Sequence, residues 1–246
     1  MLRQTDISPL SRLVMRVDAA ADSGVPGDSF ATGFPSVDKW LGGGLRRGDL
    51  VVLGGEVGAG KSSLALAMSL RMAQAGINSA FFTAEMTVER VMERVLAIEG
   101  RARVDDIRNG ALDEPTRAAV GAAAVRLRDG SPIIDNLPPG GVQTLADAVR
   151  RTLDVQVTFI DSLQALGLGQ REQDEELAVA VRTLKALAIE TGVALVVTSD
   201  LPAIVVGRDD PRPGLGDFGA LGAVKAHADI ILGVYRSEEH TSELQS

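Results

Sequence analysis

The sequence predicts an α/β fold with a mostly parallel central sheet and helices on both faces of that sheet. Two observations support this prediction. From Leu50 onward, short apolar runs alternate with longer segments of helical period, and a glycine-rich loop joins the first apolar run to the first helical segment. Alternating strands and helices of this kind produce parallel strands whose two faces are covered by the connecting helices.

The expected strands are the apolar runs at residues 50–54, 79–84, 157–161, 193–199 and 228–234. The expected helices cover residues 62–76, 87–100, 113–130 and 175–192. A glycine stands at the end of each helical segment, where a left-handed residue commonly terminates a helix; these are Gly76, Gly100, Gly130 and Gly192. The aromatic residues Trp40 and Tyr235 flank apolar residues, so we expect both in the core.

Composition excludes several classes of protein. The chain has 246 residues, 45% of them hydrophobic, with 25 Lys+Arg against 33 Asp+Glu for a net charge of −8, which is typical of a globular protein rather than a collagen-like or disordered one. It has no cysteine, which excludes disulfides and thiol catalysis. No apolar stretch approaches the ~18 residues that cross a bilayer. We therefore expect a cytoplasmic protein with no membrane partner, whose acidity leaves room only for a local basic groove.

The two ends of the chain differ from the middle. Residues 1–28 end in the cluster DSGVPGDS, which predicts an N-terminal extension or linker before a domain at 29–235. The last residues, 236–246, read RSEEHTSELQS and are similar to the translation of a common sequencing adapter. We expect a non-native tail there, and a natural chain that continues after Tyr235. Without residues 237–246, which carry three glutamates, the net charge is −5.

The glycine-rich loop matches the phosphate-binding pattern G-x-x-x-x-G-K-[ST] between a strand and a helix. Its backbone N–H groups and the helix N-terminus attract phosphate oxygens. Lys61 is expected to reach the β- and γ-phosphates, and the Ser62 hydroxyl to ligate Mg²⁺. The nucleotide-binding residues expected from this motif are Gly55, Glu56, Val57, Gly58, Ala59, Gly60, Lys61, Ser62 and Ser63.

Two acidic residues follow expected strands. Asp161 ends the strand VTFID, where doubly wound sheets bind ligands, and it is a candidate Mg²⁺ ligand or a cap of the next turn. After a phosphate-binding loop we prefer the metal role. Glu85 follows the strand SAFFTA and could orient or deprotonate an attacking water. By its spacing alone, however, Glu85 is better explained as a solvated carboxylate.

The wider pattern carries a family resemblance. The segments TGFPSVDKWLGGGLRRGDLVVLGGEVGAGKSSLALAM, FFTAEM, IEGRARVDDIRNGAL, VTFIDSLQAL and RTLKALAIETGVALVVTSDL resemble the C-terminal ATPase domain of DnaB-type replicative helicases across residues 32–235. These helicases are RecA-like P-loop motors. The first segment is shared with RadA and KaiC relatives, whereas the stretch from AEM to DIRNGAL favours the DnaB type.

The resemblance implies a function and a set of roles. It implies ATP and Mg²⁺ as cofactors, single-stranded DNA as a partner in replication, and a homo-oligomer in the form of a hexameric ring. Lys61 and Glu85 would be catalytic, and Ser62 and Asp161 would hold the metal. The alternative is a RecA-, KaiC- or RadA-like regulatory or recombination ATPase that does not unwind DNA. A third possibility is a nucleotide-binding module without turnover.

The sequence also departs from the family pattern. Asp200 stands where the family has a glutamine that senses the γ-phosphate, and a carboxylate there repels phosphate unless it is protonated or turned away. Residues 218–222 read FGALG where the family has an Arg-Glu-Ser-Gly loop that contacts DNA. Arg208 and Arg212 are candidate replacements for the lost arginine, although a solvated loop explains them more simply. The arginine that the family inserts into a neighbouring subunit is expected downstream of Tyr235.

Overall fold

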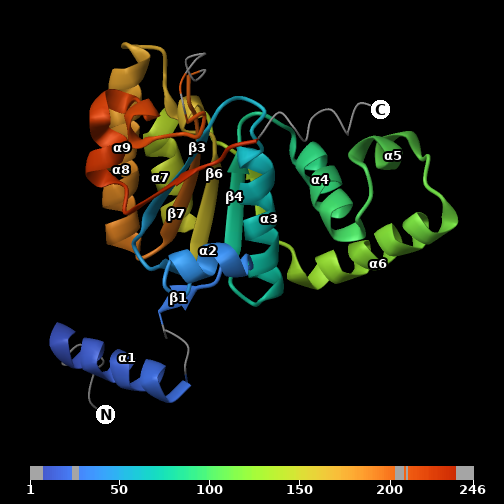
Figure 1. The fold of residues 1–246 in the computed structure, drawn as a ribbon, viewed down its shortest axis with the longest axis horizontal. Helices are drawn as coiled ribbons and strands as arrows, with labels where there is room; N and C mark the ends of the chain where they lie inside the picture. The colour runs from blue at the N-terminus through green and yellow to red at the C-terminus, as the bar shows by residue number, and fades with distance from the viewer. Residues whose placement is uncertain (1–7, 24–27, 203–207, 209, 237–246) are drawn as a thin grey trace.

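A six-stranded sheet organises the chain, and all its neighbouring strands are parallel (Figure 1). The computed structural model describes residues 8–23, 28–202, 208 and 210–236. The strand order is β5-β4-β6-β7-β3-β8. The strands are β3 (Leu50–Gly55), β4 (Ser79–Thr83), β5 (Ile133–Asn136), β6 (Val157–Asp161), β7 (Ala194–Asp200) and β8 (Ile230–Gly233); a separate antiparallel pair consists of β1 (Ser29–Phe30) and β2 (Leu45–Arg46).

Helices cover both faces of this sheet (Figure 1). The α-helices are α1 (Pro9–Ser23), α2 (Pro35–Trp40), α3 (Lys61–Gln74), α4 (Val88–Gly100), α5 (Val104–Asn109), α6 (Glu114–Gly130), α7 (Gly141–Arg151), α8 (Gln173–Thr191) and α9 (Ala223–His227). Short 3₁₀ turns are η1 (Leu163–Leu166), η2 (Leu215–Asp217) and η3 (Ala220–Gly222). No helix in the described part of the chain is both long enough and apolar enough to span a bilayer.

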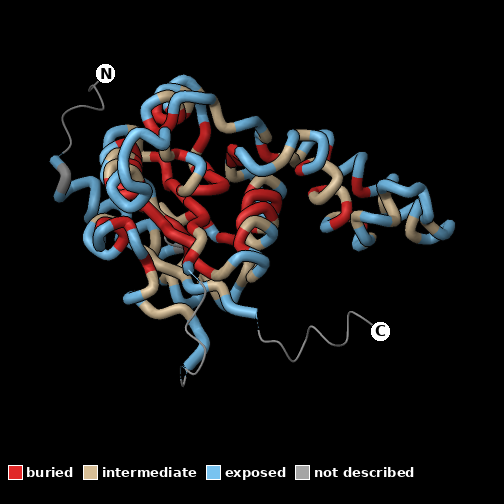
Figure 2. Tube along the Cα trace, turned by 90° about the horizontal axis from the view of Figure 1, so that it is seen from above, coloured by how far each residue is buried: buried red, intermediate tan, exposed pale blue. Residues whose placement is uncertain are grey.

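The buried side chains form two cores, one on each face of the sheet, and Figure 2 shows them concentrated on the strands and on the inner sides of the helices. Successive residues of a strand point to opposite faces. In β3, Leu50 and Val52 accordingly join the core shared with α7 and α8, whereas Val51 and Leu53 join the core shared with α3. Burial on both faces explains why the strands are continuous apolar runs.

The predicted fold class is confirmed, and all five expected strands and four expected helices are present. The structure also contains elements that the sequence pattern did not predict: helices α1, α2, α5, α7 and α9, strand β5 and the small β1–β2 pair. Helix α1 lies within the N-terminal extension and apart from the sheet (Figure 1). The expectation of core positions was wrong for Trp40 and Tyr235, which are 89% and 42% exposed.

The expected helix ends were only partly right. Gly76 and Gly192 have φ of 80° and 69°. After helix α4, however, the left-handed capping residue is Arg101 with φ 51°, and the residue that caps α6 is Ser131 in an extended conformation. Gly100 serves packing instead, since a Cβ there would lie 2.9 Å from Val120 of α6. A glycine at a helix end can therefore mark close contact between helices rather than a left-handed turn.

Parallel strands bring the expected site residues to one edge of the sheet. Gly55 of β3 pairs in register with Asp200 of β7, and Thr83 of β4 pairs with Asp161 of β6. All four strands end at this edge, so the phosphate-binding loop and the acidic strand ends lie side by side. In open α/β sheets this edge is where ligands bind.

Candidate active site

The phosphate-binding loop connects β3 to α3 and depends on its glycines. Gly58 and Gly60 have φ of 83° and 102°, a left-handed region that strains other residues. A Cβ on Gly55 would lie 2.4 Å from the carbonyl oxygen of Val234 in the neighbouring chain segment. Helix α3 starts at Lys61, so its N-terminal N–H groups open into the loop, where such groups can attract an anion.

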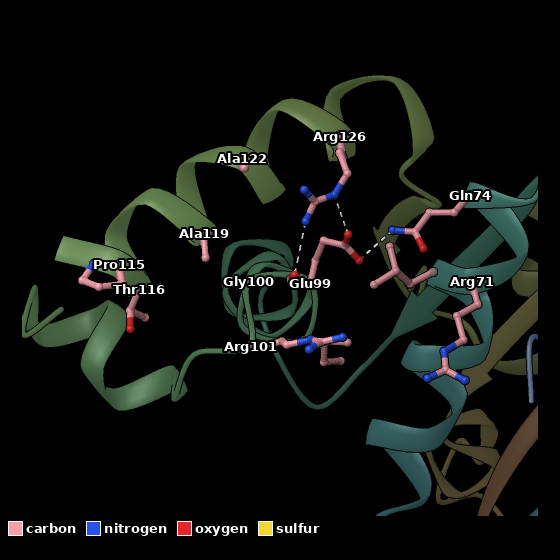
Figure 3. A pocket seen from close by; sticks show the side chains of 12 residues that line it. Arg71, Gln74, Glu99, Gly100, Arg101, Pro115, Thr116, Ala119, Ala122 and Arg126 are labelled. Atoms are coloured by element: carbon pink, nitrogen blue, oxygen red, sulfur yellow. Dashed lines mark hydrogen bonds and ion pairs between the residues drawn. The ribbon is translucent and has the colours of Figure 1, made fainter. Parts of the chain in front are cut away.

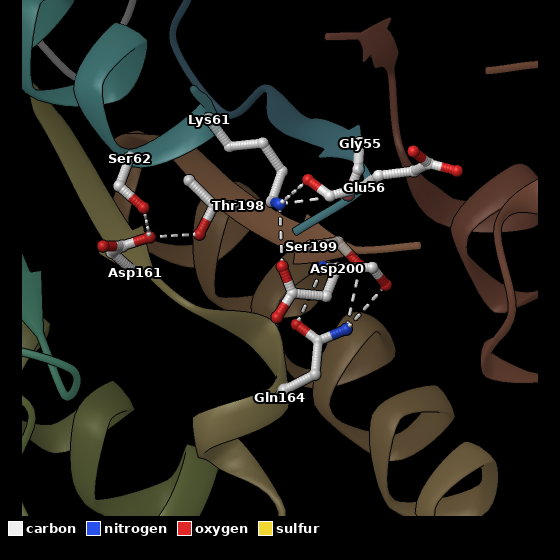
Figure 4. A network of polar contacts seen from close by, with 9 residues as sticks. All are labelled: Gly55, Glu56, Lys61, Ser62, Asp161, Gln164, Thr198, Ser199 and Asp200. Carbon is white, nitrogen blue, oxygen red and sulfur yellow. Dashed lines mark hydrogen bonds and ion pairs between the residues drawn. The ribbon is translucent and has the colours of Figure 1, made fainter. Parts of the chain in front are cut away.

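Lys61 is buried at the centre of this site. Its side chain is 7% exposed, and its Nζ donates to the carbonyl oxygens of Gly55 and Glu56 at 3.0 and 2.9 Å (Figure 4). The Nζ also forms an ion pair with Asp200 Oδ1 at 2.7 Å. The Asp200 carboxylate is therefore not turned away from the loop; it neutralises the lysine that was expected to bind phosphate.

The Ser62 hydroxyl and Asp161 lie together, as the metal prediction requires. Ser62 Oγ donates to Asp161 Oδ1 at 2.9 Å, and Thr198 Oγ1 donates to the same oxygen at 2.5 Å (Figure 4). Asp161 is 1% exposed, and its Oδ2 is buried without a hydrogen-bond partner. A buried carboxylate oxygen with no partner is costly unless something binds it. Carboxylate and hydroxyl oxygens are ligands that suit Mg²⁺, so these residues fit that ion.

Glu85 lies beside the same residues, just after β4. It lines a cavity of about 390 Å³ together with Lys61, Ser62, Asp161 and Asp200. Burial raises the pKa of Glu85 above its ordinary value, and the charges of Asp161 and Asp200 raise it further. A hydrogen bond from Ser162 and the charge of Lys61 oppose this shift. Its carboxylate thus shares the cavity with the loop, and a raised pKa makes it a better proton acceptor once it is ionised.

Sequence reasoning missed Thr198 and Arg94, which line this cavity, and Gln164, which holds the backbone of Asp200 beside it. Gln164 of η1 accepts a hydrogen bond from the Asp200 N–H and donates to the Asp200 carbonyl, each at 3.1 Å (Figure 4). Thr198 orients Asp161, and Arg94 of α4 lines the cavity. Thr198 stands two residues before Asp200 on β7, so strand alternation could have placed both on one face. Arg94 gave no comparable signal, because it lies inside an ordinary amphipathic helix.

The candidate DNA contacts are engaged elsewhere. Arg208 pairs with Asp217 at 2.8 Å, and Arg212 pairs with Asp210 at 2.9 Å. Hydrogen bonds from Arg212 lower the pKa of Asp210 to about 2. Phe218 is buried at 4% exposure. Arg208 and Arg212, the candidate replacements for the lost arginine, are thus both paired with nearby carboxylates, and residues 203–207 and 209 lie outside the described part of the chain.

A larger cavity, of about 640 Å³, lies between α3, α4 and α6 (Figure 3). Glu99 accepts hydrogen bonds there from Gln74 and Arg126, both at 2.7 Å. None of the phosphate-binding loop residues lines it. Size alone therefore does not identify the nucleotide site, and the 390 Å³ cavity at the strand ends is the candidate on chemical grounds.

The sequence matches one family model and is similar to several curated proteins. Residues 29–246 match the family described as the DnaB-like helicase C terminal domain. The chain is 26% identical over 222 residues to a replicative DNA helicase DnaB of Geobacillus stearothermophilus, covering 87% of this chain and 49% of that protein. It is 27% identical over 222 residues to the replicative DNA helicase DnaC of Bacillus subtilis, with the same coverage. The chain spans about half the length of these curated relatives.

Solved structures show the same fold. One solved ATPase domain matches with a TM-score of 0.83 at 21% identity, covering 97% of this chain and 87% of that one. A DnaB-like replicative helicase, solved in a study of its interactions with primase, matches with a TM-score of 0.80 at 21% identity, covering 98% of this chain and 59% of that one. The fold is thus the RecA-like one that the resemblance implied. On the match of residues 29–246, the chain belongs to the family of DnaB-like helicase C-terminal domains.

Proposed function

We propose that this chain is the ATPase motor of a DnaB-type helicase, which binds ATP with Mg²⁺ in the 390 Å³ cavity and hydrolyses it. One observation carries the proposal: Ser62 of the phosphate-binding loop bonds to Asp161, whose second carboxylate oxygen is buried without a partner. A structural strand-end aspartate does not need a free buried oxygen, whereas a metal ligand does.

Each residue of the site has a separate role in the proposed hydrolysis. The loop N–H groups and the N-terminus of α3 bind phosphate oxygens, and Lys61 contributes a charge to the β- and γ-phosphates. Ser62 and Asp161 would hold Mg²⁺, which neutralises charge on the phosphates when bound. Glu85 orients the attacking water and accepts its proton, which its position and its raised pKa favour. Catalysis of this kind consists mainly of positioning and electrostatic stabilisation.

The motor is proposed to act on single-stranded DNA as a hexameric ring, with a neighbouring subunit supplying an arginine. The family match supports this proposal over the RecA-, KaiC- or RadA-like alternative. The test measures ATP hydrolysis with and without single-stranded DNA, with Glu85→Gln as the inactive control. Stimulation by DNA supports the motor, and hydrolysis that DNA leaves unchanged supports a regulatory ATPase.

The pairing of Arg208 and Arg212 limits the DNA contacts expected of this chain. On single strands, each Lys or Arg that binds a phosphate adds ~0.7 to the slope of log K against log salt. We therefore expect binding that depends only weakly on salt. A steep salt dependence, lost in Arg208→Ala or Arg212→Ala, would show that these ion pairs open to receive DNA.

A further inference from the structure

The ammonium of Lys61 has no donor left for a phosphate. An ammonium group carries three N–H donors. Those of Lys61 meet three oxygens, namely the carbonyls of Gly55 and Glu56 and the Oδ1 of Asp200 (Figure 4). A phosphate oxygen can accept a hydrogen bond from Lys61 Nζ only if it displaces one of these three oxygens.

The two carbonyls are fixed by backbone hydrogen bonds. Gly55 O also accepts from the N–H of Leu201 at 3.0 Å, and Glu56 O accepts from the N–H of Ala59 at 3.1 Å. Moving either carbonyl would deform the phosphate-binding loop or the start of the segment after β7. We therefore expect neither carbonyl to be displaced from Lys61 by a phosphate.

The Asp200 side chain is the movable partner. It is 37% exposed, whereas the Lys61 side chain is 7% exposed. Both backbone groups of Asp200 are held by Gln164, so the carboxylate can leave Lys61 only by rotation of its own side chain. After rotation, the carboxylate remains near the phosphates, because its backbone has not moved.

We propose that Asp200 is an internal competitor for the nucleotide phosphates, which occupies Lys61 in the free protein and has to rotate away when nucleotide binds. The proposal rests on the function proposed above. Under this proposal, Asp200 lowers the affinity of the site for both the nucleoside diphosphate and the triphosphate. By returning to Lys61, its side chain also speeds the release of the diphosphate product.

The first test measures nucleotide affinity by calorimetry in the presence of Mg²⁺, using ADP and an ATP analogue with an imido bridge between the β- and γ-phosphates. Asp200→Asn keeps the size of the side chain and removes its charge, so we expect both dissociation constants to fall on the order of tenfold. Asp200→Ser should give the same direction. Asp129→Asn on α6 makes the same change of charge at an exposed ion pair and should leave affinity unchanged.

The second test needs no nucleotide. Urea unfolding of the single and double variants of Lys61→Met and Asp200→Asn measures how strongly the two side chains are coupled. The proposal requires a favourable coupling in the free protein together with tighter binding by Asp200→Asn. A residue with a purely structural role would lower stability without tightening binding.

The outcomes separate this proposal from the proposed function. If no variant binds nucleotide, the ATPase assignment fails and the competition fails with it. If binding depends on Lys61 but Asp200→Asn has an unchanged or larger dissociation constant, the competition alone is overturned. Absence of coupling between the two residues overturns it as well.

Discussion

The contact between Gly54 and Phe218 gives the most sharply defined prediction. An alanine at position 54 would place its Cβ 2.1 Å from Phe218 Cε1 and 2.5 Å from Cζ, far inside van der Waals contact. Gly54 lies in β3 between β7 and β8, so its backbone cannot retreat. Phe218 is 4% exposed and packs in the core beside α8. The ring must therefore move.

Gly54→Ala should destabilise the protein by about 1–3 kcal/mol, which is typical of overpacking in a well-filled core. In a chain of this length, each kcal/mol lowers the Tm by roughly 2–4 °C. The expected fall is thus about 2–12 °C, measured by thermal unfolding of the nucleotide-free protein. The matched control is Gly121→Ala in α6, where no atom lies within 4 Å of the added Cβ; it should stabilise the helix by about 0.5–1 kcal/mol.

The double variant tests the cause. Phe218→Ala alone should cost about 3–5 kcal/mol through the cavity that it leaves. Gly54→Ala in that background should cost little, because the ring that it meets is gone, so the two effects should be non-additive by about 1 kcal/mol or more. Additive effects, or an unchanged Tm in Gly54→Ala, would refute the packing argument and the buried position of Phe218.

Three substitutions test the site itself. Glu85→Gln should keep nucleotide affinity and lower turnover by ~10² or more. The pKa of Glu85 is raised in the folded protein, so its ionised form lowers the stability of the fold at pH values above that pKa. The uncharged Glu85→Gln variant should therefore unfold at a higher urea concentration than the parent at neutral pH. Asp161→Asn should weaken nucleotide binding in the presence of Mg²⁺ and leave nucleotide binding in EDTA unchanged; calorimetry in both buffers measures the two affinities. Lys61→Ala should abolish nucleotide binding and also lower the Tm, since it leaves Asp200 without its cation; equal affinity in the parent and this variant would remove the phosphate-binding assignment.

The sequence predicted the parts of the site that depend on local chemistry. The loop requires glycines at fixed spacing before Lys61, and parallel strands buried on both faces are apolar runs whose ends are easy to place. Strand β5 escaped this reasoning because it is a largely exposed edge strand of four residues, IIDN, with little apolar signal. The N-terminal helix α1 was missed because the glycine and proline cluster after it indicates a linker.

The role of Asp200 could not be read in the same way. The sequence showed a carboxylate at an unexpected strand end, but its effect depends on which cation it meets. Lys61 and Asp200 approach each other only because β3 and β7 are neighbours in the sheet, although β4, β5 and β6 lie between those two strands along the chain. Strand order is a property of the whole fold, so a local sequence pattern cannot predict which side chains of neighbouring strands form a pair.

The pH dependence of turnover links Asp200 to Glu85. Burial is the largest cause of the raised Glu85 pKa, followed by the charges of Asp161 and Asp200, and Lys61 acts in the opposite direction. Asp200→Asn removes one of the raising charges, so it lowers the pKa of Glu85. A general base works only when ionised, and activity is lost as pH falls through its pKa.

The acid limb of the turnover profile should therefore move to lower pH in Asp200→Asn and stay in place in Asp129→Asn, whose side chain does not line the cavity. Turnover at saturating nucleotide, measured across the acid range, separates this effect from the change in affinity. An acid limb that does not move in Asp200→Asn would mean that Glu85 does not sense the charge at position 200, and that another group limits hydrolysis at low pH.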